Sequence, residues 1–370
     1  MEKFKKITVV ALFLLFIFGF FFLHLILPDA EFSEAERKPL AQVPTLSAEG
    51  IVSGDYFNDA ETYLLEQFPL RQTFLNCKRW IDKNIFLMRS SGGYLTLKGH
   101  LTKIETTTNK EQIQYAVDLS NRIIEKHPEL GKVYYAVIPD KNYYLSQGNA
   151  LPTIDYETIF TLAEGIRGEK IDLTHLLSID DYYRTDSHWR QERILPVAEA
   201  LCLAMGVQPA DPNSYSSTVL DGFKGVYYAL TNSPPEPESL IYLRNKAIDN
   251  ALTERMGNGM QMEQMEIYNE GNFNKELTDS YDVFLEGPES VITINNPNAT
   301  SDKHLILIRD SFGSSLTPLL VDSYAKITVL DLRYINSNHF AYAGVDFTDA
   351  DVLFLYSTNV FNSAKNLGLK

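Results

Sequence analysis

The hydrophobic pattern begins with an almost unbroken apolar run from Ile7 to Leu27, interrupted only by Thr8, Gly19 and His24. At a rise of 1.5 Å per residue, a helix of this length spans about 30 Å, which is the hydrocarbon thickness of a bilayer. The run therefore predicts a transmembrane helix.

The residues beside this run predict its orientation. Lysines precede it and carboxylates follow it: Lys3, Lys5 and Lys6 on one side, and Asp29, Glu31, Glu34 and Glu36 on the other. Since positively charged flanks stay in the cytoplasm, we expect residues 1–28 to form a cytoplasmic tip and a signal anchor in the cell membrane, with the rest of the chain outside. The alternative is a cleaved signal peptide, whose apolar region spans about 7–15 residues and ends at a small-x-small site. This run is longer, and Leu27 to Ala30 is a poor cleavage site.

Residues 29–60 are polar and contain Pro39 and Pro44, so they predict a stalk or linker. From Asp59 to about Leu87 the apolar spacing is helical, and Pro69 divides it into two helices. The folded ectodomain is expected over residues 61–370.

Apolar runs and helical patterns alternate through much of this ectodomain. A turn and a short strand are expected at 91–97. Further strands are expected at 132–138, 170–173, 304–308, 326–330 and 352–356, and helices at 111–127, 156–167, 188–205 and 312–324. Continuous apolar strands that alternate with helices are typical of a parallel sheet covered on both faces, which is an α/β fold.

Residues from about 207 to 300 break this alternation. They are rich in proline and predict an irregular or β-rich insertion with short antiparallel strands, for example at 239–243 and 290–295.

Charge and cysteine content narrow the function classes. The chain has 33 basic and 48 acidic residues, for a net charge of −15, and no basic stripe with aromatic residues, so a nucleic-acid partner is not expected. There is no Cys/His pattern with zinc spacing, and neither a metal nor a cofactor is expected. Cys77 and Cys202 are interpreted as buried thiols, although the sequence leaves a bridge between them open.

The strongest candidate chemistry lies at Asp186 and His188, where a helix is predicted to begin and Pro196 to kink it or reset its start. An aspartate two residues before a histidine can accept the N–H of the ring, which fixes the tautomer and stabilises the imidazolium. His188 is then a candidate general base.

Ser311 is the candidate nucleophile because it directly follows the apolar strand at 304–308 and begins a predicted helix. Ligands bind at the carboxyl ends of parallel strands, and helix N-termini offer free N–H groups to a developing oxyanion. A serine hydroxyl needs a base, which His188 would supply. Helix capping is the simpler alternative for each stretch alone, by Thr185, Asp186 and Ser187 in the first and by Asp310 or Ser311 in the second. A G-x-S-x-G elbow is absent, which disfavours an α/β-hydrolase proper.

Three further residues follow predicted strands. Lys141 is interpreted as a solvated loop charge or a site residue, and Arg333 as a surface charge or an anion contact. Asn359 is interpreted as a turn residue.

Four segments together resemble the DHHW family of bacterial cell-surface proteins and, more distantly, the alginate O-acetyltransferase proteins AlgX and AlgJ. They are Leu65–Arg71 (LEQFPLR), Ala136–Lys141 (AVIPDK), Tyr183–Trp189 (YRTDSHW) and Leu307–Phe312 (LIRDSF). The resemblance implies an SGNH-hydrolase-like three-layer domain in which Asp186 and His188 form the Asp-x-His pair and Ser311 is the nucleophile. The motif order is circularly permuted, because Asp-x-His precedes the serine. Ser187 replaces the first histidine of the family name. The resemblance also implies an oxyanion-hole asparagine, for which Asn359 is the candidate as the alternative to a turn residue, although it lacks the usual Gly-x-Asn-Asp context.

Three functions follow as hypotheses. The first is a serine O-acetyltransferase that acts on a cell-envelope or secreted polysaccharide, with acetyl groups supplied by a membrane-bound O-acyltransferase partner, as the resemblance implies. The second is an O-acetyl esterase with the same three residues. The third is a non-catalytic glycan-binding or scaffold protein of the cell surface.

Overall fold

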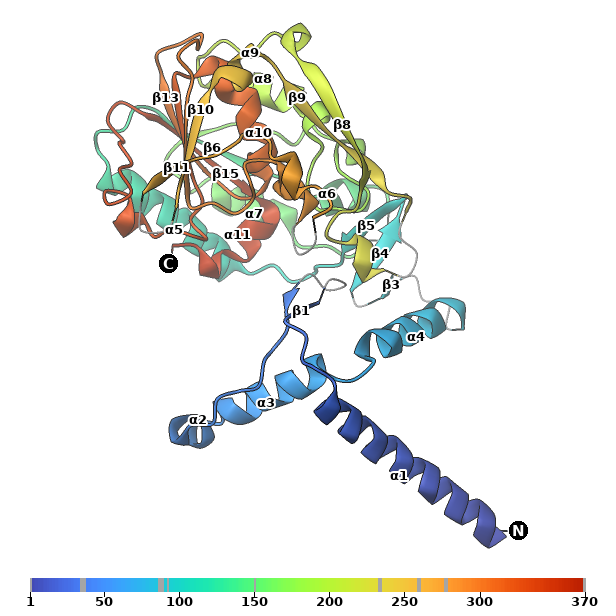
Figure 1. Ribbon diagram of the computed structural model, residues 1–370. Coiled ribbons are helices and arrows are strands. Elements are labelled where there is room, and N and C mark those ends of the chain that lie inside the picture. The colour runs from blue at the N-terminus through green and yellow to red at the C-terminus, as the bar shows by residue number, and fades with distance from the viewer. Residues whose placement is uncertain are drawn as a thin grey trace. The chain divides into compact units, whose positions relative to one another are not determined.

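The computed structural model describes residues 2–33, 38–85, 90–91, 93–149, 151–231, 235–257, 261–275 and 279–368. The chain divides into two compact units. The first comprises Met1–Gly92 with Ala229–Ser233, and the second comprises Gly93–Tyr228 with Pro234–Lys370. Figure 1 shows the course of the chain through both.

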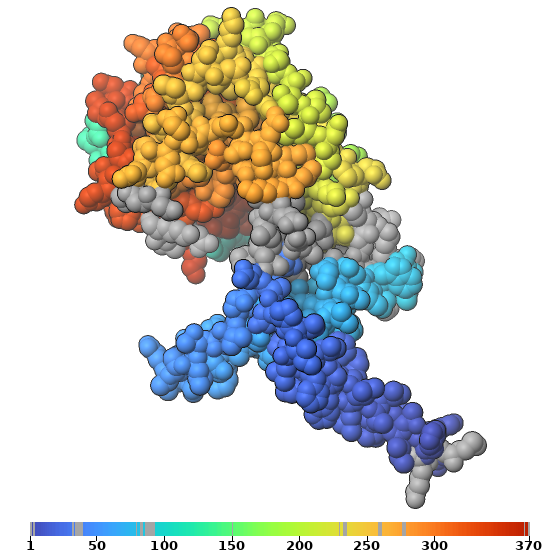
Figure 2. Space-filling view, viewed as in Figure 1, coloured from blue at the N-terminus to red at the C-terminus, as the bar shows by residue number. Residues whose placement is uncertain are grey.

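The first unit is built around an N-terminal apolar helix, α1 (Glu2–Ile26), which confirms the predicted helix. Its segment Phe4–Ile26 is long and apolar enough to cross a membrane and is not buried by the rest of the chain. Figure 2 shows most of this helix uncovered. The unit also holds three helices, α2 (Ala48–Ser53), α3 (Asp55–Glu66) and α4 (Arg71–Asn84), and three short strands, β1 (Phe32–Ser33), β2 (Lys38–Pro39) and β3 (Ser90–Ser91).

Pro69 lies between α3 and α4, as predicted, and α2 and the start of α3 fall within the segment that the sequence assigned to a linker. Leu70, which precedes α4, has a φ of 60°, so the chain turns sharply there before the second helix begins.

The second unit contains an eight-stranded sheet in the order β11-β10-β12-β14-β13-β15-β6-β7. The strands are β6 (Val133–Ile138), β7 (Glu169–Lys170), β10 (Leu252–Met256), β11 (Met262–Gln264), β12 (Val291–Asn295), β13 (His304–Arg309), β14 (Lys326–Leu330) and β15 (Asp351–Ser357). From β14 through β13, β15 and β6 to β7 all neighbours are parallel, whereas β12, β10 and β11 join antiparallel. The predicted α/β fold with a mainly parallel sheet is confirmed.

Helices cover both faces of this sheet because alternate strand residues point to opposite sides. On one face Leu305 and Leu307 pack in a core with α8 (Leu195–Ala204) and α10 (Phe312–Leu320). On the other face Ile306 and Ile308 pack in a core with α5 (Lys110–Lys126), α7 (Tyr156–Ala163) and α11 (Thr358–Asn362). The central strands are therefore apolar throughout, which is why the sequence predicted them well.

The segment between residues 207 and 300 has two parts. One is an antiparallel pair, β8 (Ser216–Phe223) and β9 (Glu238–Arg244), followed by α9 (Lys246–Asn250). The other supplies β10, β11 and β12, which extend the main sheet. Both strands predicted there, 239–243 and 290–295, are confirmed. A hairpin of β4 (Tyr94–Leu97) and β5 (His100–Lys103) and the short helix α6 (Lys141–Ser146) complete the unit.

The two cysteines differ in their environments. Cys202 is buried and Cys77 is exposed, and both thiols are free. The prediction of a buried thiol is confirmed for Cys202 and wrong for Cys77.

Candidate active site

Ser311 lies where β13 ends and α10 begins, as its position after an apolar strand predicted. The neighbouring Asp310 fixes this turn with its buried carboxylate. One oxygen accepts from the backbone N–H of Phe312 at 3.0 Å, and the other accepts from that of Ser357 at 2.7 Å. Asp310 thus bonds the first N–H of α10 from the position before the N-cap residue, which is Ser311, and the Ser311 side chain does not cap the helix. This leaves the Ser311 hydroxyl available for another partner.

That partner is His188, whose Nε2 lies 2.8 Å from Ser311 Oγ. The other ring nitrogen, Nδ1, lies 2.6 Å from Asp186 Oδ1. Because a carboxylate can only accept, Nδ1 carries the proton, and Nε2 is left as an acceptor for the serine hydroxyl. The structure thus places the three residues that the sequence singled out in one hydrogen-bonded chain.

Asp186 is fully buried and held ionised. Burial alone would raise its pKa, but the charge of His188 and hydrogen bonds hold the pKa well below its usual range. These bonds come from the His188 ring, from the His188 backbone N–H at 2.9 Å and from the Val226 backbone N–H at 2.8 Å. The carboxylate is therefore a fixed acceptor for the ring.

The chain around Asp186 differs from the prediction. No α-helix begins at His188: Tyr182 and Trp189 form an antiparallel bridge, a short 3-10 helix covers Gln191–Arg193, and α8 starts only at Leu195, with Pro196 in its first turn. The expectation that Asp186 caps a helix is therefore wrong, whereas the expected effect of Pro196 on the helix start is confirmed, since proline suits the first turn of a helix.

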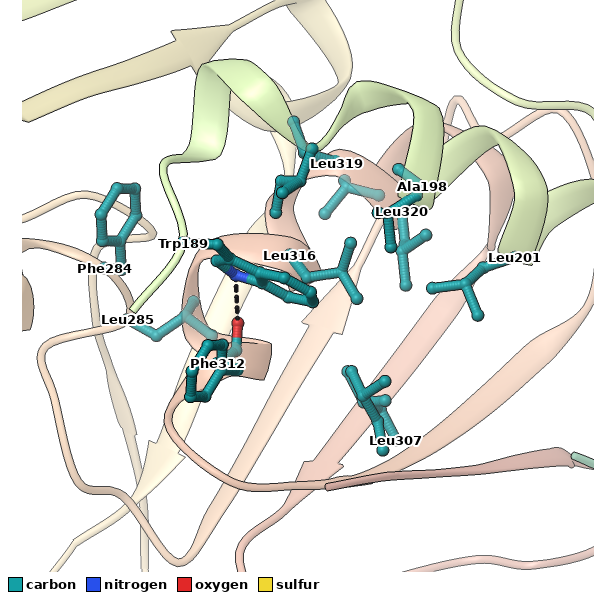
Figure 3. Close-up of a cluster of buried hydrophobic side chains, with 14 of the residues drawn as sticks. Trp189, Ala198, Leu201, Phe284, Leu285, Leu307, Phe312, Leu316, Leu319 and Leu320 are labelled. Carbon is teal, nitrogen blue, oxygen red and sulfur yellow. Dashed lines mark hydrogen bonds between the residues drawn. The ribbon is translucent and has the colours of Figure 1, made fainter. Parts of the chain in front are cut away.

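Trp189 ties this segment to the helix that follows Ser311. Its indole N–H donates to the Phe312 carbonyl at 3.0 Å and to Ser315 Oγ at 2.9 Å. Figure 3 shows the ring packed among apolar side chains of α8 and α10, with its bond to Phe312. Because Trp189 follows His188 directly, this anchor holds the imidazole near Ser311.

Tyr281 stacks on the His188 ring, with centroids 3.9 Å apart and planes inclined by 7°. Its hydroxyl donates to Ser315 Oγ at 2.7 Å, the same oxygen that accepts from Trp189. Sequence reasoning missed Tyr281, because it lies on a short 3-10 helix, Ser280–Val283, inside the segment that had no regular pattern.

The loop at residue 225 supports Asp186 from the other side. A Cβ on Gly225 would lie 2.4 Å from Asp186 Cβ and 2.5 Å from the Thr185 carbonyl oxygen, so only glycine fits there. Thr185 itself is not a helix cap: its N–H donates to buried Glu238 at 3.0 Å, and its hydroxyl accepts from the Gly225 N–H at 3.0 Å.

Lys141 is not a solvated loop charge. It is the first residue of α6, and its side chain is buried. The ammonium donates to the carbonyls of Leu101 at 2.7 Å, Tyr183 at 2.8 Å and Asp186 at 2.7 Å. Burial lowers the pKa of Lys141 to about 7, although Asp186, among other acidic groups, favours the charged form. With three donors engaged, Lys141 acts on the backbone of the Asp186 segment.

Arg333 is not a solvated charge either. Its guanidinium forms a two-point ion pair with buried Asp331, at 2.9 Å from Nε and 2.6 Å from Nη2. Buried Arg309, at the end of β13, also reaches Asp331, at 3.3 Å. Asp331 therefore pairs with two arginines at the carboxyl ends of β13 and β14.

Asn359 is half-buried in the first turn of α11, directly after β15. Its neighbour Thr358 is bonded to Asp140, two residues after β6, through the Asp140 N–H at 3.0 Å and the Thr358 hydroxyl at 2.7 Å. Its position at the carboxyl end of a strand beside β13 is as predicted, and its role stays a prediction. Among the described residues, no group of three His, Cys, Asp or Glu side chains could hold a metal ion.

Asp282 follows Tyr281 and gives the site region a pH-dependent stability. Burial and then the charge of Asp279 raise the pKa of Asp282 to about 7. A carboxyl group with a raised pKa in the folded state stabilises the fold fully below pH 4, and this contribution is lost as the pH rises through 7. We expect Asp282→Asn to be more stable than the wild type at pH 8 by roughly 3 kcal/mol, and no more stable at pH 4.

Urea unfolding at pH 4, 6 and 8 measures this difference. The matched control is Asp118→Asn, at an exposed aspartate on α5, which should follow the wild type at each pH. Equal gains for Asp282→Asn at pH 4 and pH 8 would contradict the assignment.

The chain is similar to known proteins in part of its sequence and in its fold. A family model described as DHHW protein matches residues 174–330, a range that contains Asp186, His188 and Ser311. A search of curated proteins gives no match.

Among solved structures, a DHHW family protein from Eubacterium siraeum DSM 15702 is 21% identical, with a TM-score of 0.60 over 75% of this chain and 95% of that chain. Bacillus cereus PatB1 is also 21% identical, with a TM-score of 0.58 over 72% of this chain and 96% of that chain. The O-acetyltransferase domain of Pseudomonas putida AlgJ is 12% identical, with a TM-score of 0.43 over 73% of this chain and 92% of that chain. The first two likenesses show a shared fold.

Proposed function

The chain belongs to the DHHW protein family by its residues 174–330, and we propose that it is a membrane-anchored serine O-acyltransferase that acetylates an extracytoplasmic polysaccharide. The observation that carries the proposal is the hydrogen-bonded chain from Ser311 Oγ through His188 to Asp186, with distances of 2.8 and 2.6 Å. A buried acid, an oriented imidazole and a serine hydroxyl in this order can perform acyl transfer. The fold is proposed to be SGNH-like, with the permuted motif order expected from the sequence.

In the first half of the reaction, Ser311 Oγ attacks the carbonyl carbon of an acetyl ester, and His188 Nε2 takes the hydroxyl proton. Asp186 stabilises the imidazolium that forms, since its carboxylate is already fixed by backbone N–H groups. The oxyanion collapses, the ester bond to the leaving alcohol breaks, and His188 returns the proton to that alcohol. The product is an acetyl-Ser311 ester.

The developing oxyanion needs N–H donors. No protein acceptor for the backbone N–H of Ser311 is found among the described residues, and this N–H lies at the N-terminus of α10, where the helix dipole favours negative charge. Asn359 is the proposed second donor, from the end of the adjacent strand β15. Arg333 is proposed as a substrate contact through its Nη1, which the two-point pair with Asp331 leaves out.

In the second half of the reaction, a sugar hydroxyl gives its proton to His188 Nε2 and attacks the acetyl carbonyl, and Ser311 leaves as the free hydroxyl. Water in place of the sugar would make the protein an acetylesterase. We favour a transferase because the four sequence motifs resemble those of O-acetyltransferase proteins.

Location follows from the N-terminal sequence. The lysine flank of α1 is proposed to stay in the cytoplasm, so that residues 61–370 lie outside as the ectodomain beyond a linker at 29–60. Since no acyl-CoA pool is expected there, the acetyl group would be delivered through the membrane by an O-acyltransferase partner.

The test uses the purified full-length protein in lipid nanodiscs with a chromogenic acetyl ester, with and without an oligosaccharide acceptor. We expect an added acetyl mass on the peptide that contains Ser311, and acetylated sugar that grows with acceptor concentration. Release of acetate alone, unchanged by any acceptor, would favour the esterase. Absence of both the acyl-enzyme and hydrolysis would contradict both and favour the scaffold hypothesis.

A further inference from the structure

We propose that α4 is a second membrane element, a basic amphipathic helix that lies in the interface of an anionic bilayer beside the exit point of α1. The proposal rests on the proposed membrane anchoring by α1 and is independent of the proposed catalysis. It concerns the first unit only.

The turn between α3 and α4 packs on α1 inside the apolar segment. Phe20 of α1 stacks on Phe68, with centroids 5.2 Å apart and an interplanar angle of 12°, and it also contacts Phe74 at 5.6 Å. Phe20 precedes the end of the span, Ile26, by six residues, which corresponds to about 9 Å along a helix axis. Interfacial helices bury their apolar face about 5–10 Å into the headgroup and acyl boundary, so this contact sets the start of α4 at a matching depth.

Polar contacts fix the same junction at the end of the span. His24 Nδ1 lies 3.2 Å from the Gln67 carbonyl oxygen, and the Gln67 amide donates to the Ala30 carbonyl at 2.8 Å. The Tyr63 hydroxyl donates to the Asp29 carboxylate at 3.1 Å. These bonds join the end of α1 to α3 just where the apolar run ends.

The side of α4 that continues from this junction is apolar and exposed. Leu70, Phe74, Ile81 and Ile85 recur at helical spacing, and the exposed fractions of Leu70 and Ile85 are 58% and 59%. Phe20 of α1 contacts this stripe at Phe74, near its start, whereas Leu70 and Ile85 at its two ends stay exposed. Trp80, also 59% exposed, is of the residue type that prefers membrane interfaces.

The net charge of α4 favours an anionic lipid surface as the partner of its apolar side. The α4 sequence contains four basic residues and one acidic residue, a net charge of +3 in a chain whose net charge is −15. The neighbouring helix α3 has four acidic residues and no basic ones, although it also exposes apolar side chains. Anionic headgroups attract α4 and repel α3, and a basic amphipathic helix is typical of a membrane surface.

The exposed Cys77 lies on the apolar side of α4, within one turn of Phe74, and serves as a probe because the other thiol, Cys202, is buried. The full-length protein is labelled at Cys77 with an environment-sensitive fluorophore. It is reconstituted into phosphatidylcholine vesicles with about 30% phosphatidylglycerol or with none. Vesicle flotation first establishes that α1 is inserted, independently of the probe.

We expect a blue shift and strong quenching by lipids that carry a nitroxide near the headgroup, weaker quenching by a nitroxide at the acyl end, and a smaller effect without phosphatidylglycerol. The matched control moves the label by one residue to the opposite side of α4, in Asn76→Cys with Cys77→Ser, and should stay unquenched.

Water-like emission from Cys77 in floated vesicles would overturn the proposal. Efficient Cys77–Cys77 disulfide formation without lipid quenching would also overturn it, in favour of a second copy of the chain as the occupant of this face. Neither result would depend on whether Ser311 is acetylated.

Discussion

Replacing Ser311 with alanine is expected to lower kcat for acetyl-ester hydrolysis and for transfer by about 10⁵-fold or more, as for other nucleophiles that act with a base. The hydroxyl is the only atom lost, and its partner is the His188 ring at 2.8 Å. Because Ser311 is half-buried and does not cap α10, the melting temperature should change little. Initial rates with a chromogenic acetate, and a thermal melt of the same preparation, measure both effects.

Asp186→Asn provides a graded comparison. The amide replaces one acceptor oxygen by a donor facing either His188 or the Val226 N–H, which favours the wrong tautomer, and a loss of about 10⁴-fold in kcat is expected. The matched control is Ser146→Ala, a half-buried serine on α6 whose hydroxyl bonds only a local carbonyl. If Ser311→Ala kept even a tenth of the wild-type rate, the hydrogen-bonded chain would not be the reacting group.

The parallel part of the sheet was predictable because its strands are buried on both faces. A strand such as β13 is a continuous apolar run, and its helix-covered neighbours β14 and β15 have the same pattern. The antiparallel part was only partly predictable, since β10 is largely half-buried, β11 is exposed, and both carry charged residues. Their place in the main sheet depends on pairing with β12, which the local sequence does not encode.

The proximity of Asp186, His188 and Ser311 was predictable, because all three combine a reactive side chain with an informative position in the chain. Asp186, His188 and Ser311 have reactive side chains at fixed spacing or directly after a strand, so the sequence alone linked them. The supporting residues carry no such signal. Tyr281 is an aromatic residue in an irregular segment, and Gly225 matters only because Asp186 packs against it. Predicting a helix at His188 failed because Tyr182 pairs with Trp189 over the intervening turn.

Lys141 bonds the backbone of the segment that carries Asp186. Its ammonium joins three carbonyls, one from β5 and two from the segment that ends in Asp186. A cation at this point neutralises carbonyl dipoles that would otherwise face each other in a buried space. The segment that carries Asp186 has no regular secondary structure of its own, so we infer that Lys141 is a positioning residue for the Asp186–His188 pair.

Lys141→Met is therefore expected to lower kcat by about 10²-fold, because small displacements of a catalytic group cost this much, with little change in KM. It should also lower the free energy of unfolding, by about 3 kcal/mol at pH 9, since buried carbonyls lose their donor. The loss should depend on pH. The pKa of Lys141 is about 7 in the folded protein and about 10.4 in an unfolded chain, so the unfolded state binds the extra proton between these values and the wild type gains stability as the pH rises.

The difference between wild type and Lys141→Met should accordingly be smaller at pH 6 than at pH 9, by about 2 kcal/mol, and urea unfolding at the two pH values measures it. Lys132→Met, at an exposed lysine just before β6, is the matched control and should change neither kcat nor this pH dependence. If Lys141→Met lowered the free energy of unfolding but left kcat at the wild-type value, Lys141 would contribute to folding alone. A fall in kcat that exceeds the fraction unfolded is the result that only a positioning role explains, because it requires a folded protein whose Asp186 segment has shifted.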